Sequence, residues 1–348
     1  MEARIRKALE LAFDLQTSTD AVLHNLGGHA SLRIYWRIES PSIFNAENTL
    51  IAMVLPQDQS ALTSDEGGSS SDPVPEELPF VSVQRYLKRL GIRVPEIAYI
   101  NMDLGVLLLE DLGITMFENR ILDEPDATEN LYREAIDLLV DFQNASIKSS
   151  DKSCICWEKA FDKELLNWEL DHYIEWGIDA VFDDTDFFDG ARDEVSTKFS
   201  KLVDELIALP QALVFRDYQS RNIMWKKNEW VAIDFQDALR GPFIYDLVAL
   251  LRDSYIELAP DLVARLVDYY AEQDLPWELS KEEIHHAFHL QTLQRKLKDT
   301  GRFIYIDQVK GNDSFLQYYA PSLQYVKNAL ENLPFKEDPV WNKIVQNG

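Results

Sequence analysis

Cysteines, basic residues and long apolar runs are all scarce in this sequence of 348 residues. Its two cysteines, Cys154 and Cys156, are too few for a disulfide framework, which favours a cytoplasmic protein. No run of about 18 apolar residues occurs, so no membrane span is expected. Residues 1–16 are charged throughout and predict an amphipathic helix rather than a secretory signal.

The charge balance is strongly acidic, with 34 basic against 60 acidic residues and a net charge of −26. Such a charge disfavours nucleic acid and anionic membranes as partners, because both reward basic surfaces. It fits either a cleft that attracts cations or simply a solvated acidic surface.

The order of predicted elements indicates two lobes, as the chain length also does. Segments rich in β-branched and aromatic residues predict strands at 21–27, 31–38, 49–55, 94–100 and 105–113. Apolar residues at helical spacing predict helices at 79–91, 129–145, 157–176 and 193–209. Residues 57–77 have the composition of a mobile loop. We therefore predict an α+β fold, with a small β-rich lobe at 1–112 and a larger, mainly helical lobe at 113–348.

One β-rich island, residues 212–238, interrupts the helical half and holds the most informative motif. In FRDYQSRN (215–222), Asp217 is followed five residues later by Asn222, and the next hairpin ends at Asp234. A strand, loop, strand, turn, strand order would place these three side chains at one mouth. Phosphoryl transfer needs such a set: one carboxylate for the attacking hydroxyl, and an amide and a second carboxylate for Mg²⁺.

The motif resembles the catalytic loop HxDxxxxN and the following IDF of the aminoglycoside phosphotransferase and choline kinase superfamily. The resemblance implies a protein-kinase-like fold over nearly the whole chain. It also implies that Asp217 is the catalytic base, and that Asn222 and Asp234 are the Mg²⁺ ligands. The sequence departs from the pattern at Phe215, where the family usually has a histidine that supports the loop.

Four further strings resemble the bacterial N-acetylmuramate/N-acetylglucosamine anomeric kinases: GHASLRIYWR (28–37), LLLEDLG (107–113), IDFQDALRGPFIYDLVALLRD (233–253) and QRKLKDTGRF (294–303). In that family ATP phosphorylates the anomeric hydroxyl of an amino sugar of the cell wall. The resemblance thus implies ATP and Mg²⁺ as cofactors. It leaves the sugar open.

The predicted nucleotide side lacks the strand lysine that kinases normally use for the phosphates. No lysine occurs between Lys7 and Lys88, and Met53 stands near the expected position. Alternating residues of a strand share a face, so Arg33 or Arg37 could supply the cation; both could equally be ordinary solvated residues. Candidates for nucleotide binding in this segment are Gly27, Gly28, Ser31, Arg33 and Arg37.

LLLEDLG predicts the hinge between the lobes, where the backbone around Glu110 and Leu112 could read adenine; it could also be a plain buried strand. On the acceptor side, Asp237 could touch the substrate or brace the loop. The helix carrying Trp168 and Glu169 could hold a sugar or simply pack in the core. Arg221 completes the acceptor candidates.

We therefore predict an ATP-dependent kinase for a small-molecule hydroxyl, with an amino sugar as acceptor and the anomeric hydroxyl as its target. Alternatives are an aminoglycoside, choline or homoserine kinase of the same fold, or a silent nucleotide- or sugar-binding relative. Neither nucleic acid nor a membrane is expected as a partner. The predicted state is a monomer or weak dimer.

Overall fold

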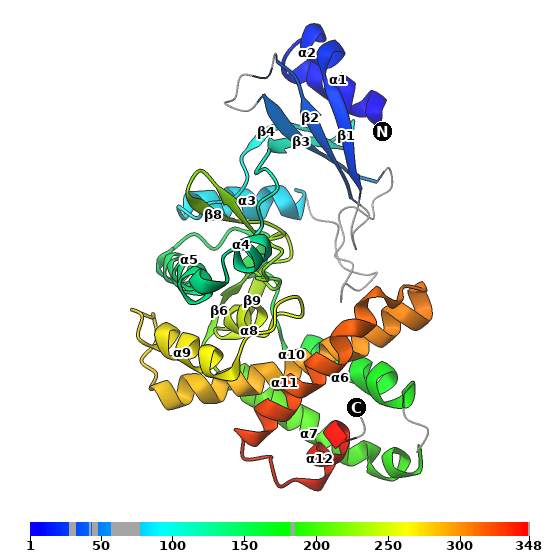
Figure 1. The fold of residues 1–348 in the computed structure, drawn as a ribbon, viewed down its shortest axis with the longest axis vertical. Helices are drawn as coiled ribbons and strands as arrows, with labels where there is room; N and C mark the ends of the chain where they lie inside the picture. The colour runs from blue at the N-terminus through cyan, green and yellow to red at the C-terminus, as the bar shows by residue number, and fades with distance from the viewer. Residues whose placement is uncertain (28–32, 42, 44–47, 57–76, 182–184, 347–348) are drawn as a thin grey trace.

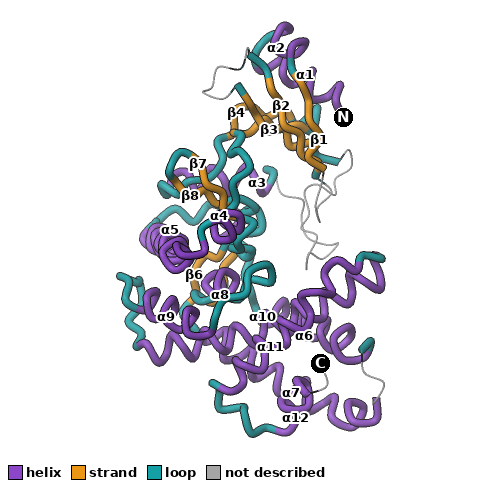
Figure 2. The backbone as a smooth tube through the Cα atoms, in the orientation of Figure 1, coloured by secondary structure: helices purple, strands orange, loops and turns teal. Residues whose placement is uncertain are grey.

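The computed structural model describes residues 1–27, 33–41, 43, 48–56, 77–181 and 185–346. A β-rich lobe forms one end of the molecule, and a larger helical lobe forms the other (Figure 1). Figure 2 shows the contrast: five strands gather in the N-terminal lobe, while helices dominate the C-terminal lobe. The predicted α+β, two-lobed architecture is confirmed.

The N-terminal lobe is an antiparallel sheet of order β1-β2-β3-β5-β4. Its strands are β1 (Val22–Gly27), β2 (Ile34–Glu39), β3 (Thr49–Val54), β4 (Ile97–Asn101) and β5 (Val106–Glu110). Successive side chains of β5 face opposite ways. Val106 and Leu108 join the core under α1 (Glu2–Ala12), whereas Leu107 and Leu109 join the core under α3 (Pro79–Arg89). A short helix, α2 (Leu15–Asp20), connects α1 to the sheet.

The C-terminal lobe is built around α10 (Lys281–Lys310), a helix of 30 residues. A capping box of Ser280 and Glu283 begins this helix, and Gly311 ends it in the left-handed conformation, with φ of 66°. The other helices are α4 (Phe117–Asp123), α5 (Thr128–Lys148), α6 (Lys163–Tyr173), α7 (Thr185–Ala208), α8 (Tyr245–Leu251), α9 (Pro260–Ala271), α11 (Tyr319–Glu331) and α12 (Pro339–Gln346). A π-helix, Ile174–Asp179, continues α6. Across the described ranges, no helix has both the length and the apolarity to cross a membrane.

The β-rich island folds as two small ribbons between α7 and α8. β6 (Gln211–Val214) pairs with β9 (Leu239–Pro242), and β7 (Ile223–Lys226) pairs with β8 (Glu229–Ala232). Lys227 and Asn228 have positive φ, as a tight two-residue hairpin turn requires. The predicted strand, loop, strand, turn, strand order is therefore present.

Three of the sequence predictions concern the bounds of a helix, a loop and the two lobes. The helix predicted at 157–176 begins at Lys163, because the Asp162 carboxylate caps it by accepting a hydrogen bond from the Leu165 amide at 2.9 Å. The predicted loop at 57–77 lies outside the described residues except for Glu77. The lobe division at residue 112 remains a prediction; β5 ends at Glu110 and α4 begins at Phe117.

Candidate active site

The loop from Phe215 to Asn222 joins β6 to β7, and Asp234 follows β8, so three predicted site residues meet at one edge of the island. The side-chain Nδ2 of Asn222 donates to the backbone carbonyl of Asp217 at 2.9 Å and lies 3.5 Å from Asp234 Oδ2. The Ile233 amide donates to the Asn222 carbonyl at 2.9 Å, which joins the loop to the end of β8. Asp217, Asn222 and Asp234 thus form one cluster, as the sequence predicted.

Two buried carboxylates hold the loop from below. Asp246 accepts hydrogen bonds from the amides of Phe215 at 2.6 Å and Arg216 at 3.1 Å. Asp253 accepts from the Ser220 amide at 2.8 Å. Burial raises the pKa of Asp246 to about 7, and the hydrogen bonds from the Phe215 and Arg216 amides act against this rise. Both ends of the loop are therefore pinned to α8 and the residues that follow it.

One residue of the loop and one of the cluster have backbone conformations that residues other than glycine normally avoid. Arg216 has φ of 77° and Asp234 has φ of 59°. Each such residue costs on the order of 1–3 kcal/mol and persists only where its surroundings impose it. The loop is consequently held in a fixed shape that points Asp217 out of the core.

Phe215, the departure from the family pattern, is an apolar support for the loop. Its side chain is 2% exposed, and its ring centroid lies 4.2 Å from that of Phe142 and 5.3 Å from that of Tyr218. The Tyr218 hydroxyl in turn donates to the Ala135 carbonyl of α5 at 2.8 Å. The loop thus rests on α5 through an aromatic stack.

Arg295 of α10 contacts the cluster, and the sequence analysis missed it. Its Nη2 lies 3.3 Å from Asp217 Oδ1, and its Nη1 donates to the Arg216 carbonyl at 2.9 Å. The segment QRKLKDTGRF carried a resemblance but no local signal of this contact, because 78 residues separate the two partners. Arg295 therefore joins the candidate residues from the structure alone.

The surroundings of Asp234 fit a divalent cation. Desolvation by the surrounding protein raises the pKa of Asp234, although its side chain stays exposed to solvent, and the charge of Asp217 adds to this effect. A cation beside the carboxylate would offset both penalties. Gln236 Nε2 bridges Asp234 at 2.9 Å and Asp237 at 3.1 Å, so Asp237 belongs to the same network. An amide oxygen and a carboxylate are ligands that Mg²⁺ accepts while keeping several waters.

Arg33 and Tyr35, just before and within β2 of the N-terminal lobe, interact electrostatically with this cluster. The charge of Arg33 acts on both Tyr35 and Asp234, and the Tyr35 hydroxyl also feels Asp234. Gly27 has φ of 83°, a conformation that favours glycine. Gly28 and Ser31 lie outside the described residues. Of the two predicted cations, Arg33 is thus the one whose charge acts on the Asp234 carboxylate.

Arg37 lies on the same strand but is bound to the hinge. Its guanidinium forms two hydrogen bonds with the Asp111 carboxylate, at 2.7 and 3.0 Å, and one with the Gly113 carbonyl at 2.8 Å. Asp111 is 5% exposed, and Gly113 has φ of 85°. Met53, opposite Tyr35 in the β2–β3 register, is fully buried. The structure therefore separates the two arginines that the sequence left as alternatives.

The hinge carries a small apolar cluster below it. Leu112 packs with Met224 and Val231, and Met116 and Ile233 border this group. Ile233 immediately precedes Asp234 in the chain, so this apolar group borders the cluster. Such a surface would suit a flat apolar ring. The Glu110 side chain is directed elsewhere, since it accepts hydrogen bonds from Arg93 at 2.6 Å and from the Glu96 amide at 3.1 Å. Its backbone N–H donates to the Glu96 carbonyl at 2.8 Å, so only its own carbonyl remains a candidate for adenine.

The predicted acceptor residues divide into two groups. Arg221 lies in the loop between β6 and β7, where it pairs with Glu118 at 2.8 and 3.0 Å and its guanidinium carbon lies 3.7 Å from the Tyr255 ring centroid. On α6, Trp168 is 46% exposed, whereas Glu169 is buried and accepts from Gln294 Nε2 at 2.7 Å. Glu169 is therefore bound to Gln294, the residue before Arg295, whereas the Trp168 side chain is exposed to solvent.

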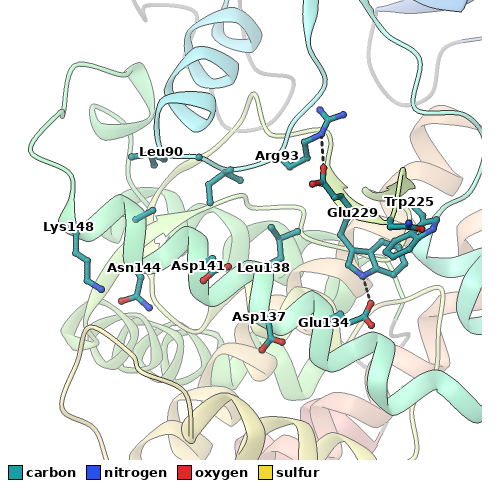
Figure 3. Close-up of a pocket in the computed structure, with 15 residues that line it drawn as sticks. Leu90, Arg93, Glu134, Asp137, Leu138, Asp141, Asn144, Lys148, Trp225 and Glu229 are labelled. Carbon is teal, nitrogen blue, oxygen red and sulfur yellow. Dashed lines mark hydrogen bonds and ion pairs between the residues drawn. The ribbon is translucent and has the colours of Figure 1, made fainter. Parts of the chain in front are cut away.

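A separate pocket of about 800 Å³ lies between the end of α3, α5 and the β7–β8 hairpin (Figure 3). Figure 3 shows Arg93 paired with Glu229 and an indole donating to Glu134; the latter is Trp230 Nε1 at 2.7 Å. Asp217, Asn222 and Asp234 do not line it. The pocket is therefore distinct from the cluster.

Known proteins resemble this chain in sequence and in fold. A model of the phosphotransferase enzyme family matches residues 44–279. The N-acetylmuramate/N-acetylglucosamine kinase of Neisseria meningitidis serogroup B is 31% identical over 261 residues, which are 72% of this chain and 73% of that protein.

Solved structures share the fold at low sequence identity. A choline kinase from Cryptosporidium parvum superposes with a TM-score of 0.64 at 10% identity, covering 97% of this chain and 99% of that one. An ADP-bound aminoglycoside phosphotransferase superposes with a TM-score of 0.59 at 13% identity, covering 93% of this chain and 98% of that one. The two lobes thus have the architecture of choline kinases and aminoglycoside phosphotransferases.

Proposed function

Because the chain belongs to the phosphotransferase enzyme family, whose members transfer phosphate to a hydroxyl, we propose that it is an ATP-dependent sugar kinase. The acceptor we propose is the anomeric hydroxyl of an N-acetylated amino sugar, such as N-acetylmuramate or N-acetylglucosamine. The observation that carries the proposal is the joined cluster of Asp217, Asn222 and Asp234 at the mouth between the lobes.

In this proposal Asp217 orients the acceptor hydroxyl and accepts its proton as the bond to phosphorus forms. Its side chain is 39% exposed, so an acceptor can reach it, while the loop contacts fix its direction. Asn222 and Asp234 would hold Mg²⁺, whose chemistry there is to neutralise charge on the phosphate oxygens. Positioning and electrostatics then supply most of the rate, since phosphoryl transfer demands little covalent chemistry of the protein.

The nucleotide would lie between the hinge and the cluster. Leu112, Met224 and Val231 would support the adenine ring, and the Glu110 carbonyl and the Leu112 backbone would read its edge. Arg33 would pair with phosphate oxygens, since its charge already acts at Asp234. ATP and Mg²⁺ use favours a cytoplasmic location, which we include in the proposal.

The choice of acceptor rests on the relatives and on the strings described above. The Neisseria protein is named for N-acetylmuramate and N-acetylglucosamine, and the shared region includes about three quarters of both chains. Arg221 and Asp237 border the cluster and are the side chains we propose to contact the sugar. Phe215 supports the loop by packing, so its presence gives no reason to expect a silent enzyme.

A single screen tests this function. ATP turnover with Mg²⁺ is measured against N-acetylmuramate, N-acetylglucosamine, glucosamine, an aminoglycoside, choline and homoserine, and products are identified by phosphorus NMR. We expect turnover with the N-acetylated sugars. Turnover with only choline or the aminoglycoside would reassign the acceptor, and no turnover with any member would contradict the kinase proposal.

A further inference from the structure

We propose that Arg295 is a positioning residue for Asp217: from the buried face of α10 it fixes one oxygen of the carboxylate and the backbone turn before it. The second carboxylate oxygen is then presented to the acceptor hydroxyl. This role rests on the proposed function, because it assumes that Asp217 acts on an acceptor.

The guanidinium of Arg295 is fixed by three contacts of different kinds. Nη2 faces Asp217 Oδ1 at 3.3 Å, and Nη1 donates to the Arg216 carbonyl at 2.9 Å. The ring of Tyr245 lies below, with its centroid 4.9 Å from the guanidinium carbon. The side chain is 2% exposed, against 39% for Asp217. A rigid buried cation is therefore joined to an accessible carboxylate.

The contacts also explain how the loop keeps its unusual turn. Asp246 accepts from the Arg216 amide on one side of that residue, and Arg295 donates to its carbonyl on the other. Arg216 has φ of 77°, so its peptide groups need partners on both sides to stay in place. Asp217 follows immediately, and a rotation of this turn would move its carboxylate.

Only a planar, forked side chain suits both contacts. Two nitrogens of one guanidinium reach a backbone carbonyl and a carboxylate together, whereas a lysine ammonium is a single compact charge. Replacement by lysine would keep the buried charge but lose one of the two contacts. We therefore expect Arg295→Lys to be intermediate between wild type and Arg295→Met.

Arg252 offers a matched control for the loss of a buried arginine. It is 5% exposed, and its guanidinium carbon lies 4.9 Å from the ring centroid of Tyr325 and 5.5 Å from that of Phe288. Arg252→Met removes a similar buried cation from an aromatic face away from Asp217. It separates the effect on catalysis from a general loss of packing.

The experiment measures kcat and KM on the acceptor that wild type prefers, together with thermal unfolding midpoints and ATP binding by calorimetry. For Arg295→Met we expect kcat to fall about 10²-fold, because a small misplacement of a reacting group has effects of that size. Its KM for ATP should change by less than about threefold, since the residue would touch neither nucleotide nor acceptor. Arg252→Met should keep kcat within about threefold of wild type even if its unfolding midpoint falls.

Combination with Asp217→Asn tests whether the two residues act together. If Arg295 acts through Asp217, adding Arg295→Met to Asp217→Asn should slow turnover by no more than about threefold further. Losses that multiply, or a folded Arg295→Met with kcat near wild type, would overturn the positioning role. If Arg295→Met does not fold, Arg295→Lys decides: unchanged kcat in that variant also overturns it. Absence of any acceptor in wild type would instead sink the proposed function, and the positioning role with it.

Discussion

Asp217 has the two properties that a catalytic carboxylate needs, a fixed position and an accessible face. Its backbone carbonyl accepts from Asn222, its Oδ1 faces Arg295, and its side chain remains 39% exposed. The Asp234 side chain is also exposed, but desolvation by the surrounding protein and the charge of Asp217 raise its pKa, so a nearby cation would stabilise its charged form. Similar residue types thus serve different purposes through their environments.

At Asp217 we expect the asparagine variant to lose at least about 10²–10⁴-fold in kcat, the usual range for removal of a general base. The amide has nearly the same shape, so ATP binding by calorimetry should be unchanged. Asp204→Asn, which alters a surface ion pair with Lys163, serves as the control and should stay fully active. More than about a tenth of wild-type activity in Asp217→Asn would refute its assignment as the base.

Asn222 and Asp234 are the proposed Mg²⁺ ligands. Asp234→Ala and Asn222→Ala should therefore each raise the Mg²⁺ concentration needed for half-maximal activity. The larger increase is expected for Asp234→Ala, because a carboxylate contributes charge as well as a ligand oxygen. Titration of activity with Mg²⁺ at saturating ATP gives the comparison. An unchanged Mg²⁺ requirement in both variants would move the metal site elsewhere.

At the scale of elements, local patterns predicted most of what builds the site. Alternation of β-branched and aromatic residues gave β1, β2, β3, β4 and β5, and the spacing of FRDYQSRN gave the loop between β6 and β7. Contacts between distant segments could not be read in the same way. Arg37 and Asp111 are 74 residues apart, and Arg295 and Asp217 are 78 apart, so only the fold brings them together.

The sequence left Arg33 and Arg37 as alternative phosphate-binding cations, and the structure favours Arg33 because Arg37 is bound to Asp111. Alternation predicted that Arg33, Tyr35 and Arg37 share one face of the strand. It could not show that a hinge carboxylate, Asp111, would already bind Arg37. The start of α6 at Lys163 likewise depended on Asp162 as a cap, inside a longer stretch with apolar helical spacing.

The two arginines near β2 should therefore behave differently. Arg33→Ala should weaken ATP binding by roughly 1.5–3 kcal/mol, the usual contribution of hydrogen bonds to charged groups, and leave adenosine affinity unchanged. Arg37→Ala should lower the free energy of unfolding, because Asp111 would stay buried without its partner. Calorimetry with both ligands and denaturant unfolding of both variants provide the data. Equal losses of ATP and adenosine affinity in Arg33→Ala would argue against a phosphate contact.

At the scale of the whole molecule, two lobes meet at a cluster to which each contributes. The C-terminal lobe supplies Asp217, Asn222 and Asp234 on short loops, braced by α8 and α10. The N-terminal lobe contributes Arg33, just before β2, whose charge acts on Asp234. With a net charge of −26, the protein as a whole would repel the anionic nucleotide that we propose, so Arg33 and the proposed Mg²⁺ would have to compensate.

The central claim is that the phosphoryl group of ATP passes to the anomeric hydroxyl of an N-acetylated amino sugar. Its most direct test is phosphorus NMR of reactions with N-acetylglucosamine or N-acetylmuramate, each compared with its methyl glycoside, in which the anomeric oxygen is blocked. We predict a sugar 1-phosphate from the free sugars and no phosphorylated product from the glycosides. Phosphorylation of a methyl glycoside, or no product from either free sugar, would contradict the claim.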